Sequence, residues 1–120
     1  MVIELHKRVI NRFGGIHGIR DENLLDSAVA YPRMLYKLGN EKNIYLLAAS
    51  YSYHLTKNHA FIDGNKRIGT LAMTTFLAMN DHDISIPNAR LYELAMLTAT
   101  SQITEQELAN ELEQYAMTQS

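Results

Sequence analysis

Residues 65–79 read NKRIGTLAMTTFLAM, and this stretch decides how the rest of the chain must fold. Apolar side chains occupy nearly every side of the helix that it would form, at Ile68, Leu71, Ala72, Met73, Phe76, Leu77, Ala78 and Met79. A helix that is apolar nearly all round belongs inside a domain, where other elements cover it. The stretch therefore predicts a central buried helix.

Three of the other predicted helices precede this one. The first begins at Val2 and ends at Gly14-Gly15, after apolar residues at helical spacing. The second has Asp21 as its N-cap and is limited by Pro32, because proline disfavours helical geometry in the residue before it. Asn40 is the predicted N-cap of the third helix.

Two predicted helices follow the central one. Asn88 opens the fifth helix, and Thr104 with Glu107 forms a capping box for the sixth. The only plausible strand pieces are short ones near residues 84–86. The pattern predicts an all-α fold, a single domain over residues 1–120 with about six helices packed around the central one.

Composition excludes several classes of function. A compact chain of 120 residues buries roughly two-thirds of its unfolded surface without a metal or a disulfide. Cysteine is absent, which excludes disulfides, thiolate metal sites and a cysteine nucleophile. A net charge of −2 gives no support for binding to DNA or to a membrane surface. With no signal peptide and no apolar run of about 20 residues, we expect a cytoplasmic protein.

The start of the central helix carries groups suited to phosphate binding. Helix N-termini present unpaired N–H groups and the positive end of the helix dipole. Gly64 leaves room for a phosphate to approach, and Asn65, Lys66 and Arg67 supply an amide and two cations. Single features of this kind are usually turn, cap or solvated-surface chemistry, so the prediction depends on their combination.

The loop just before that helix adds a base and a metal ligand. His59 has an unperturbed pKa of about 6.5, which suits removal of a proton from a hydroxyl. Asp63 is the natural ligand for Mg²⁺, which prefers one or two carboxylates together with substrate phosphates. Phe61 between them is expected to anchor the loop in the core. The combination indicates nucleotidyl or phosphoryl transfer.

The pattern His-x-Phe-x-Asp-Gly-Asn-Lys-Arg in residues 59–67 resembles the signature of the Fic/Doc family, in the form of its death-on-curing (Doc-like) toxins. Residues 13–28, which read FGGIHGIRDENLLDSA, resemble the N-terminal segment of the family, and the resemblance covers most of the chain. It implies the Fic/Doc fold.

The resemblance also implies a role for each matching position. His59 corresponds to the general base that activates the target hydroxyl, and Asp63 to the magnesium-binding acid. Gly64 and Asn65 correspond to the anion-binding nest, and Arg67 to the phosphate-binding arginine.

Two departures from the AMP-transferring members place the chain with the Doc-like toxins. Those members typically have glycine where this chain has Lys66, and a second arginine where it has Thr70. The resemblance then implies that the nucleotide binds in reversed orientation, so that the terminal phosphate is transferred. A lysine in the nest takes space from a deeply placed α-phosphate, which gives the reversal a physical reason.

The resemblance implies a toxin of a toxin–antitoxin system with ATP, or another nucleoside triphosphate, and Mg²⁺ as cofactors. It would transfer the γ-phosphate to a Ser/Thr hydroxyl of elongation factor EF-Tu and so inhibit translation, and a Phd-like antitoxin would be its partner. AMP transfer to a protein hydroxyl is the alternative within enzymes. A catalytically silent interaction module is a further alternative, which intact His59, Asp63, Asn65 and Arg67 argue against.

The remaining histidines, and one acidic segment, are interpreted as structural. Solvent or capping roles are expected for the scattered residues His6, His17, His54 and His82. Residues 101–106 weakly resemble an inhibitory element found in some family members, with Glu105 in the critical place. Gln106 breaks that pattern, and Thr70 leaves no second arginine for Glu105 to bind. We therefore interpret the segment as the approach to the last helix.

Overall fold

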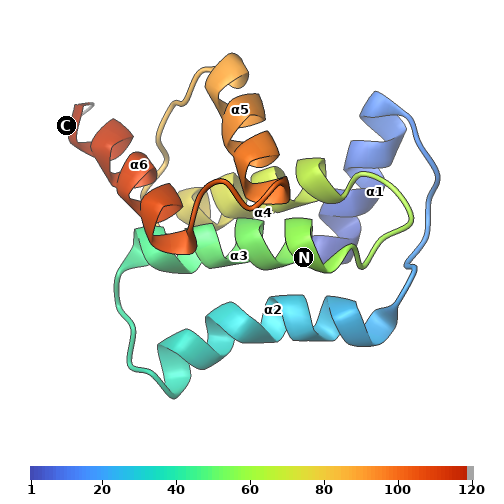
Figure 1. Cartoon of the computed structure of the whole chain (residues 1–120), viewed down its shortest axis with the longest axis horizontal. Helices are drawn as coiled ribbons and strands as arrows, with labels where there is room; N and C mark the ends of the chain where they lie inside the picture. The colour runs from blue at the N-terminus through green and yellow to red at the C-terminus, as the bar shows by residue number, and fades with distance from the viewer. Residues whose placement is uncertain (119–120) are drawn as a thin grey trace.

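The computed structural model describes residues 1–118 and contains six helices (Figure 1). Their bounds are α1 Val2–Phe13, α2 Glu22–Lys37, α3 Ile44–Asn58, α4 Asn65–Met79, α5 Asn88–Ala99 and α6 Glu105–Thr118. Within the described residues no strand forms, and the only extended pairing is an isolated antiparallel bridge between Ile19 and Phe61. The all-α prediction is confirmed.

The antiparallel pair α3 and α4 forms the centre of the domain. α3 packs against α2, α4, α5 and α6, and α4 packs against α1, α3 and α5 (Figure 1). Every residue of α3 is buried or partly buried, whereas α4 exposes Lys66 and Arg67 at its start and Ala78 and Met79 at its end. The predicted central helix therefore shares that place with its neighbour, and both of its ends reach the surface.

The core divides into two clusters along this central pair. The first cluster joins α1, α2, the loop before α4 and the facing ends of α3 and α4, through Val2, Leu5, Leu25, Ala28, Leu55, Ala60, Phe61, Ile68 and Ala72. The second joins the opposite ends of α3 and α4 to α5 and α6, through Ala48, Ala49, Met73, Leu77, Ile86, Leu94, Leu108, Ala109 and Leu112. The loop predicted to carry the chemistry thus belongs to the first cluster.

Two details of the predicted helices need correction. Asn40 is not the third N-cap; Asn43 is, because its side chain accepts hydrogen bonds from the N–H groups of Tyr45 and Leu46. Pro32 does not limit the second helix, which continues to Lys37. The Pro32 ring is buried, and the free energy gained by this burial offsets the cost of the hydrogen bond that proline cannot donate.

The strand pieces expected near residues 84–86 do not form, and that segment is an irregular connection whose Ile86 packs into the second core cluster. The other capping predictions are confirmed. Asp21 accepts a hydrogen bond from the N–H of Leu24 at the start of α2. The Thr104–Glu107 capping box is closed by reciprocal hydrogen bonds of 3.0 and 3.1 Å. No helix of residues 1–118 has the length and apolar character to cross a membrane.

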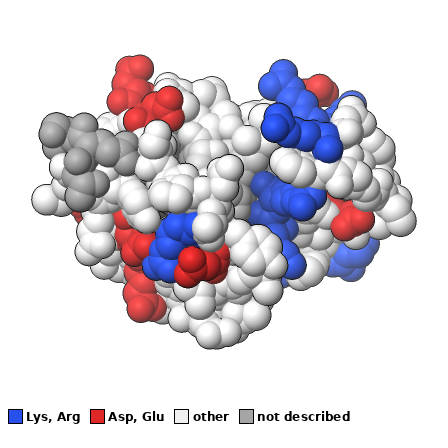
Figure 2. All heavy atoms as spheres, turned by 90° about the horizontal axis from the view of Figure 1, so that it is seen from above, with Lys and Arg blue, Asp and Glu red and all other residues white. Residues whose placement is uncertain are grey.

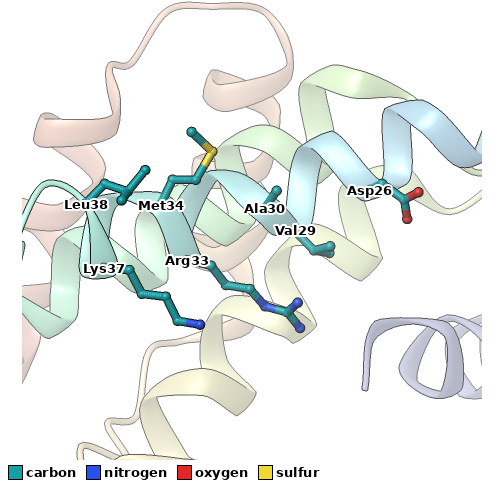
Figure 3. Close-up of a pocket in the computed structure, with 7 residues that line it drawn as sticks. All are labelled: Asp26, Val29, Ala30, Arg33, Met34, Lys37 and Leu38. Carbon is teal, nitrogen blue, oxygen red and sulfur yellow. The ribbon is translucent and has the colours of Figure 1, made fainter.

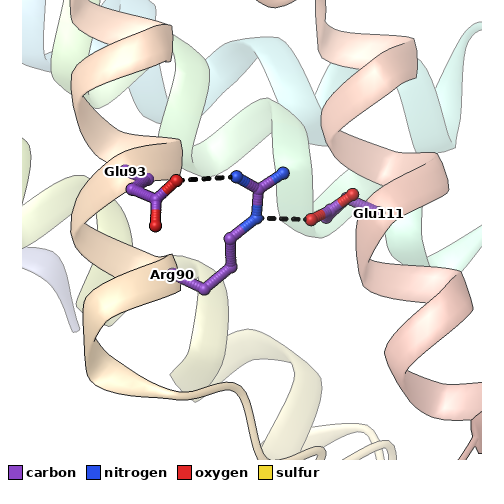
Figure 4. Close-up of polar contacts among 3 residues, drawn as sticks. All are labelled: Arg90, Glu93 and Glu111. Atoms are coloured by element: carbon purple, nitrogen blue, oxygen red, sulfur yellow. Dashed lines mark hydrogen bonds and ion pairs between the residues drawn. The ribbon is translucent and has the colours of Figure 1, made fainter.

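An arginine ties α5 to α6. Arg90 on α5 donates a 2.6 Å hydrogen bond to Glu111 on α6 and a 3.1 Å hydrogen bond to Glu93 one turn further along its own helix (Figure 4). The hydrogen bond to Glu111 is the main reason that the pKa of the Arg90 guanidinium is raised above its usual value. This pair of contacts fixes the outer side of α5, whose inner side packs on α3 and α4.

The close approach of α3 and α4 depends on Gly69. A Cβ atom at this position would overlap Thr56 Oγ1 and lie 2.9 Å from the carbonyl oxygen of Ser52, both on α3. Carbon and oxygen atoms that are not bonded cannot come so close without displacement of one helix. Glycine therefore sets the distance between the two central helices.

Gly69→Ala should lower the free energy of unfolding by about 1–3 kcal/mol, the usual cost of an overpacked core. Adding Thr56→Ala should recover part of that loss, because it removes the nearest obstacle but leaves the Ser52 carbonyl. The Thr56 hydroxyl is buried without a hydrogen-bond partner among residues 1–118, so Thr56→Ala alone should cost little. Urea denaturation of the three variants measures these differences; a Gly69→Ala protein as stable as the wild type would contradict the packing argument.

Candidate active site

A cleft of about 890 Å³ lies between the end of α1, the start of α4 and one side of α5. All six residues predicted from the sequence line it: His59, Asp63, Gly64, Asn65, Lys66 and Arg67. Figure 2 shows that Lys and Arg side chains gather at the α1 end of this hollowed face. The structure therefore brings the whole predicted set to one surface.

A second, shallower hollow of about 450 Å³ lies against α2 (Figure 3). Residues of α2 and its C-cap line it, including Asp26, Arg33 and Lys37, and it contains none of the predicted site residues. We therefore assign the candidate active site to the cleft between α1, α4 and α5.

Hydrogen bonds to the segment before α2 hold the His59–Gly64 loop in place. The N–H of Arg20 donates to the carbonyl of Ala60 at 2.7 Å, and the N–H of Ile62 donates to that of Gly18 at 3.1 Å. The Arg20 side chain adds a 2.7 Å hydrogen bond from its Nε to the carbonyl of His59. Two segments some 40 residues apart are thus joined along the back of the loop.

His59 is the residue that ends α3. Its backbone has left-handed geometry, with φ 51° and ψ 46°, and its side chain is exposed and lines the cleft. Among the described residues, no group forms a hydrogen bond or ring contact with the imidazole. The ring is therefore open to contact with a molecule that enters the cleft.

Asp63 is held by the backbone on both carboxylate oxygens. Oδ1 accepts a hydrogen bond from the N–H of Gly64 at 3.0 Å, and Oδ2 accepts one from that of Ile16 at 3.3 Å. Gly15 permits this approach, because a Cβ at its φ of +120° would lie 2.7 Å from Oδ2. The glycine pair after α1 thus also makes room for the acid.

Asp63 is the only carboxylate among the cleft residues, and residues 1–118 contain no cluster of three or more potential ligands for a metal ion. Each Asp63 oxygen accepts one backbone hydrogen bond and keeps further lone-pair capacity. Mg²⁺ is commonly bound by one or two carboxylates, with phosphate oxygens and waters as its other ligands. The site fits Mg²⁺ that arrives with a nucleotide.

Gly64 and Asn65 have structural roles that the sequence did not reveal. A Cβ on Gly64, at φ +76°, would point at His6, Val9 and Ile10 of α1, so glycine lets α1 pack closely; it does not open a path for phosphate on that side. The Asn65 side chain is buried and bonded to both backbone groups of Phe61, at 3.1 and 3.0 Å. Its amide braces the loop.

The phosphate-binding capacity of this helix start therefore lies in its first N–H groups and its cations. Lys66 and Arg67 are both exposed, line the cleft and form no ion pair among residues 1–118. The Arg67 guanidinium lies 4.3 Å from the centroid of the Phe13 ring, within range of a cation–π interaction. Phe13, on α1, thus orients this cation at the mouth of the cleft.

His6 supports the loop that carries Asp63, a role that the sequence interpretation missed, since we expected a solvent or capping role. Only 2% of it is exposed, and its ring stacks on Phe61 with centroids 3.8 Å apart. Because a carbonyl only accepts, His6 Nε2–H donates the 2.7 Å hydrogen bond to the Asp63 carbonyl. Its place in the apolar stripe of α1, one turn after Val2 and before Ile10, was the available signal.

The acidic segment before the last helix does not reach the cleft residues. Glu105 is the first residue of α6, and its Oε1 lies 2.7 Å from Nε2 of His54 on α3. This confirms the interpretation of residues 101–106 as the approach to that helix. The expected solvent or capping role of His54 is wrong, because its ring is partly buried and stacks on that of Tyr31 with centroids 3.9 Å apart.

The sequence also matches a known protein family. A sequence model of the Fic/DOC family matches residues 1–77, which contain α1, α2, α3, the loop and most of α4. The chain belongs to the Fic/DOC family. The match includes every predicted site residue of this Fic/DOC domain.

Two curated relatives carry Doc names. Toxin Doc of Mycolicibacterium smegmatis is 42% identical over 69 residues, which make up 57% of this chain and 53% of that protein. Protein kinase doc of Escherichia phage P1 is 24% identical over 111 residues, 92% of this chain and 87% of that protein. The first match thus spans about half the length of its relative. Together these matches place this Fic/DOC protein on the Doc-like branch.

His6→Phe should keep the stacking on Phe61 but leave the Asp63 carbonyl, which lies against the buried His6 ring, without its donor. We expect the free energy of unfolding to fall by about 1–3 kcal/mol, the usual cost of an unpaired buried polar group. His17→Phe is the matched control, because His17 is exposed and its ring is bonded only to Asn11 among residues 1–118. Urea denaturation compares the two; equal effects of both substitutions would remove the role of His6 in holding the loop.

Proposed function

We propose that this protein is the toxin of a toxin–antitoxin pair and transfers the γ-phosphate of a nucleoside triphosphate to a Ser/Thr hydroxyl of a target protein. The observation that supports this proposal is the content of one cleft at a helix N-terminus. The cleft holds the exposed imidazole of His59, the hydrogen-bonded carboxylate of Asp63, and Lys66 and Arg67, which form no ion pair among residues 1–118. The names of the relatives, a toxin and a protein kinase, support the same activity.

In the proposed reaction, His59 accepts the proton of the target hydroxyl as its oxygen forms a bond to the γ-phosphorus. The bond from that phosphorus to the β–γ bridging oxygen breaks, and its electron pair leaves with the nucleoside diphosphate. The N–H groups at the start of α4, Lys66 and Arg67 bind the phosphate oxygens and stabilise the charge that develops there.

Asp63 is the residue that would hold Mg²⁺ in this reaction. The ion would offset phosphate charge, as it does in other phosphoryl-transfer enzymes. The task of this chain is to keep the carboxylate still, and three hydrogen bonds serve that purpose: two to the carboxylate, from Ile16 and Gly64, and one from His6 to its carbonyl.

Lys66 and Thr70 support transfer of the terminal phosphate over AMP transfer. Lys66 places a long cationic side chain at the mouth of the helix, where it takes space from a deeply placed α-phosphate. Thr70 lines the same cleft, but its hydroxyl donates a 3.0 Å hydrogen bond to the Lys66 carbonyl in its own helix. We propose elongation factor EF-Tu as the target, with inhibited translation as the result, and a Phd-like antitoxin as the partner.

The transferred group can be identified by incubating the purified protein with a bacterial extract, Mg²⁺ and ATP labelled at either the α- or the γ-phosphate. We expect label on the target protein from γ-labelled ATP only, and a mass increase of one phosphoryl group. His59→Ala should lower the rate by about 10²–10⁴-fold, the usual contribution of a positioned base, while the fold persists because the side chain is exposed. Label from the α-phosphate would establish AMP transfer instead.

Asp63→Asn should raise the Mg²⁺ concentration needed for half-maximal transfer by about ten-fold or more, since even outer-shell partners of a metal contribute about 10–100-fold. Asp26→Asn is the control, because Asp26 is an exposed carboxylate on α2 that lies outside the cleft. Transfer rates are measured across a magnesium titration for the wild type and both variants. An unchanged magnesium requirement in Asp63→Asn would mean that another residue holds the ion.

A further inference from the structure

We propose that Arg12, in the last turn of α1, is an additional phosphate-binding residue and completes the polyphosphate site from the side opposite α4. The inference rests on the proposed function, because it assigns a residue to the nucleotide that the transfer requires. Arg12 lies outside the 59–67 loop, and it is separated from Arg67 by more than 50 residues of sequence.

The structure brings the two arginines to one aromatic ring. The Arg12 guanidinium lies 5.5 Å from the centroid of the Phe13 ring, and the Arg67 guanidinium lies 4.3 Å from the same centroid. Both side chains are exposed and both line the cleft that holds His59 and Asp63. Of the residues that line the cleft, these two alone carry a guanidinium.

The charges of the cleft are unbalanced without an anion. Arg12, Lys66 and Arg67 face a single carboxylate, Asp63, in a protein whose net charge is −2. None of the ion pairs formed by residues 1–118 includes any of these three cations. Two guanidiniums and an ammonium around one acid match the several negative charges of a triphosphate bound with one Mg²⁺.

The guanidinium of Arg12 can bind a phosphate in a way that a simple positive charge cannot. The planar group can donate two parallel hydrogen bonds to a phosphate, whereas lysine acts as a point charge. A cation at the C-terminal end of a helix also interacts favourably with the helix dipole, which is a purely structural role. Arg12→Lys keeps that role and removes the planar donor pair, so it distinguishes the two.

Binding to the purified full chain is measured by titration calorimetry with two probes, ATP with Mg²⁺ and inorganic triphosphate with Mg²⁺. Arg12→Gln should weaken both by about ten-fold, the loss of one charge-assisted hydrogen-bonding group. Arg12→Lys should fall between the wild type and Arg12→Gln. The matched control Arg8→Gln removes an exposed arginine one turn earlier on α1 that does not line the cleft, and should change either affinity by less than about two-fold at 0.15 M salt.

Equal affinities of the wild type and Arg12→Gln for both probes would overturn the assignment of Arg12 and leave the proposed function standing. A loss for ATP without a loss for inorganic triphosphate would overturn it as well, because the contact would then be with the nucleoside. A wild-type protein that binds neither probe would overturn the proposed function itself. Unchanged nucleotide binding with a higher KM for the target protein would place Arg12 against that protein and also overturn the inference.

Discussion

Phe61 stands in the middle of a loop that brings His59 and Asp63 to the cleft, yet only 2% of it is exposed. Its ring lies in the first core cluster against His6, and its backbone N–H and carbonyl are both bonded to the side chain of Asn65. Because one residue is fixed by packing and by hydrogen bonds, the backbone two residues before and two residues after it has little freedom. His59 and Asp63 occupy those two places.

This anchor permits backbone geometry that the loop would not adopt alone. His59 has left-handed φ and ψ, which cost a residue other than glycine roughly 1–2 kcal/mol. The hydrogen bonds from Arg20 and the burial of Phe61 offset that cost and hold the imidazole at the end of α3. The backbone that carries the imidazole is therefore already ordered, and the proposed reaction would not have to supply the entropy of ordering it.

The sequence predicted the parts of the fold and site that local patterns determine. The bounds of α4, the capping box of α6 and the shared location of all six predicted site residues followed from spacing and from the family motif. The sequence did not predict features that depend on distant partners. Pro32 is tolerated because its ring is buried, and His6 supports the site because α1 packs against a loop 57 residues away. In the sequence around Pro32 and His6, nothing outweighs the usual preference of proline to end a helix and of histidine to lie at the surface.

Because the core is divided into two clusters, the loop that carries His59 and Asp63 and the opposite side of the cleft are supported separately. The His59–Gly64 loop packs in the first cluster. In contrast, α5, which forms the far side of the cleft, packs in the second cluster and is held by the Arg90 ion pairs. Substitutions that reshape α5 can therefore accumulate without moving His59 or Asp63. Under the proposed function, such a fold would be able to change what it recognises while the residues that carry the reaction stay in place.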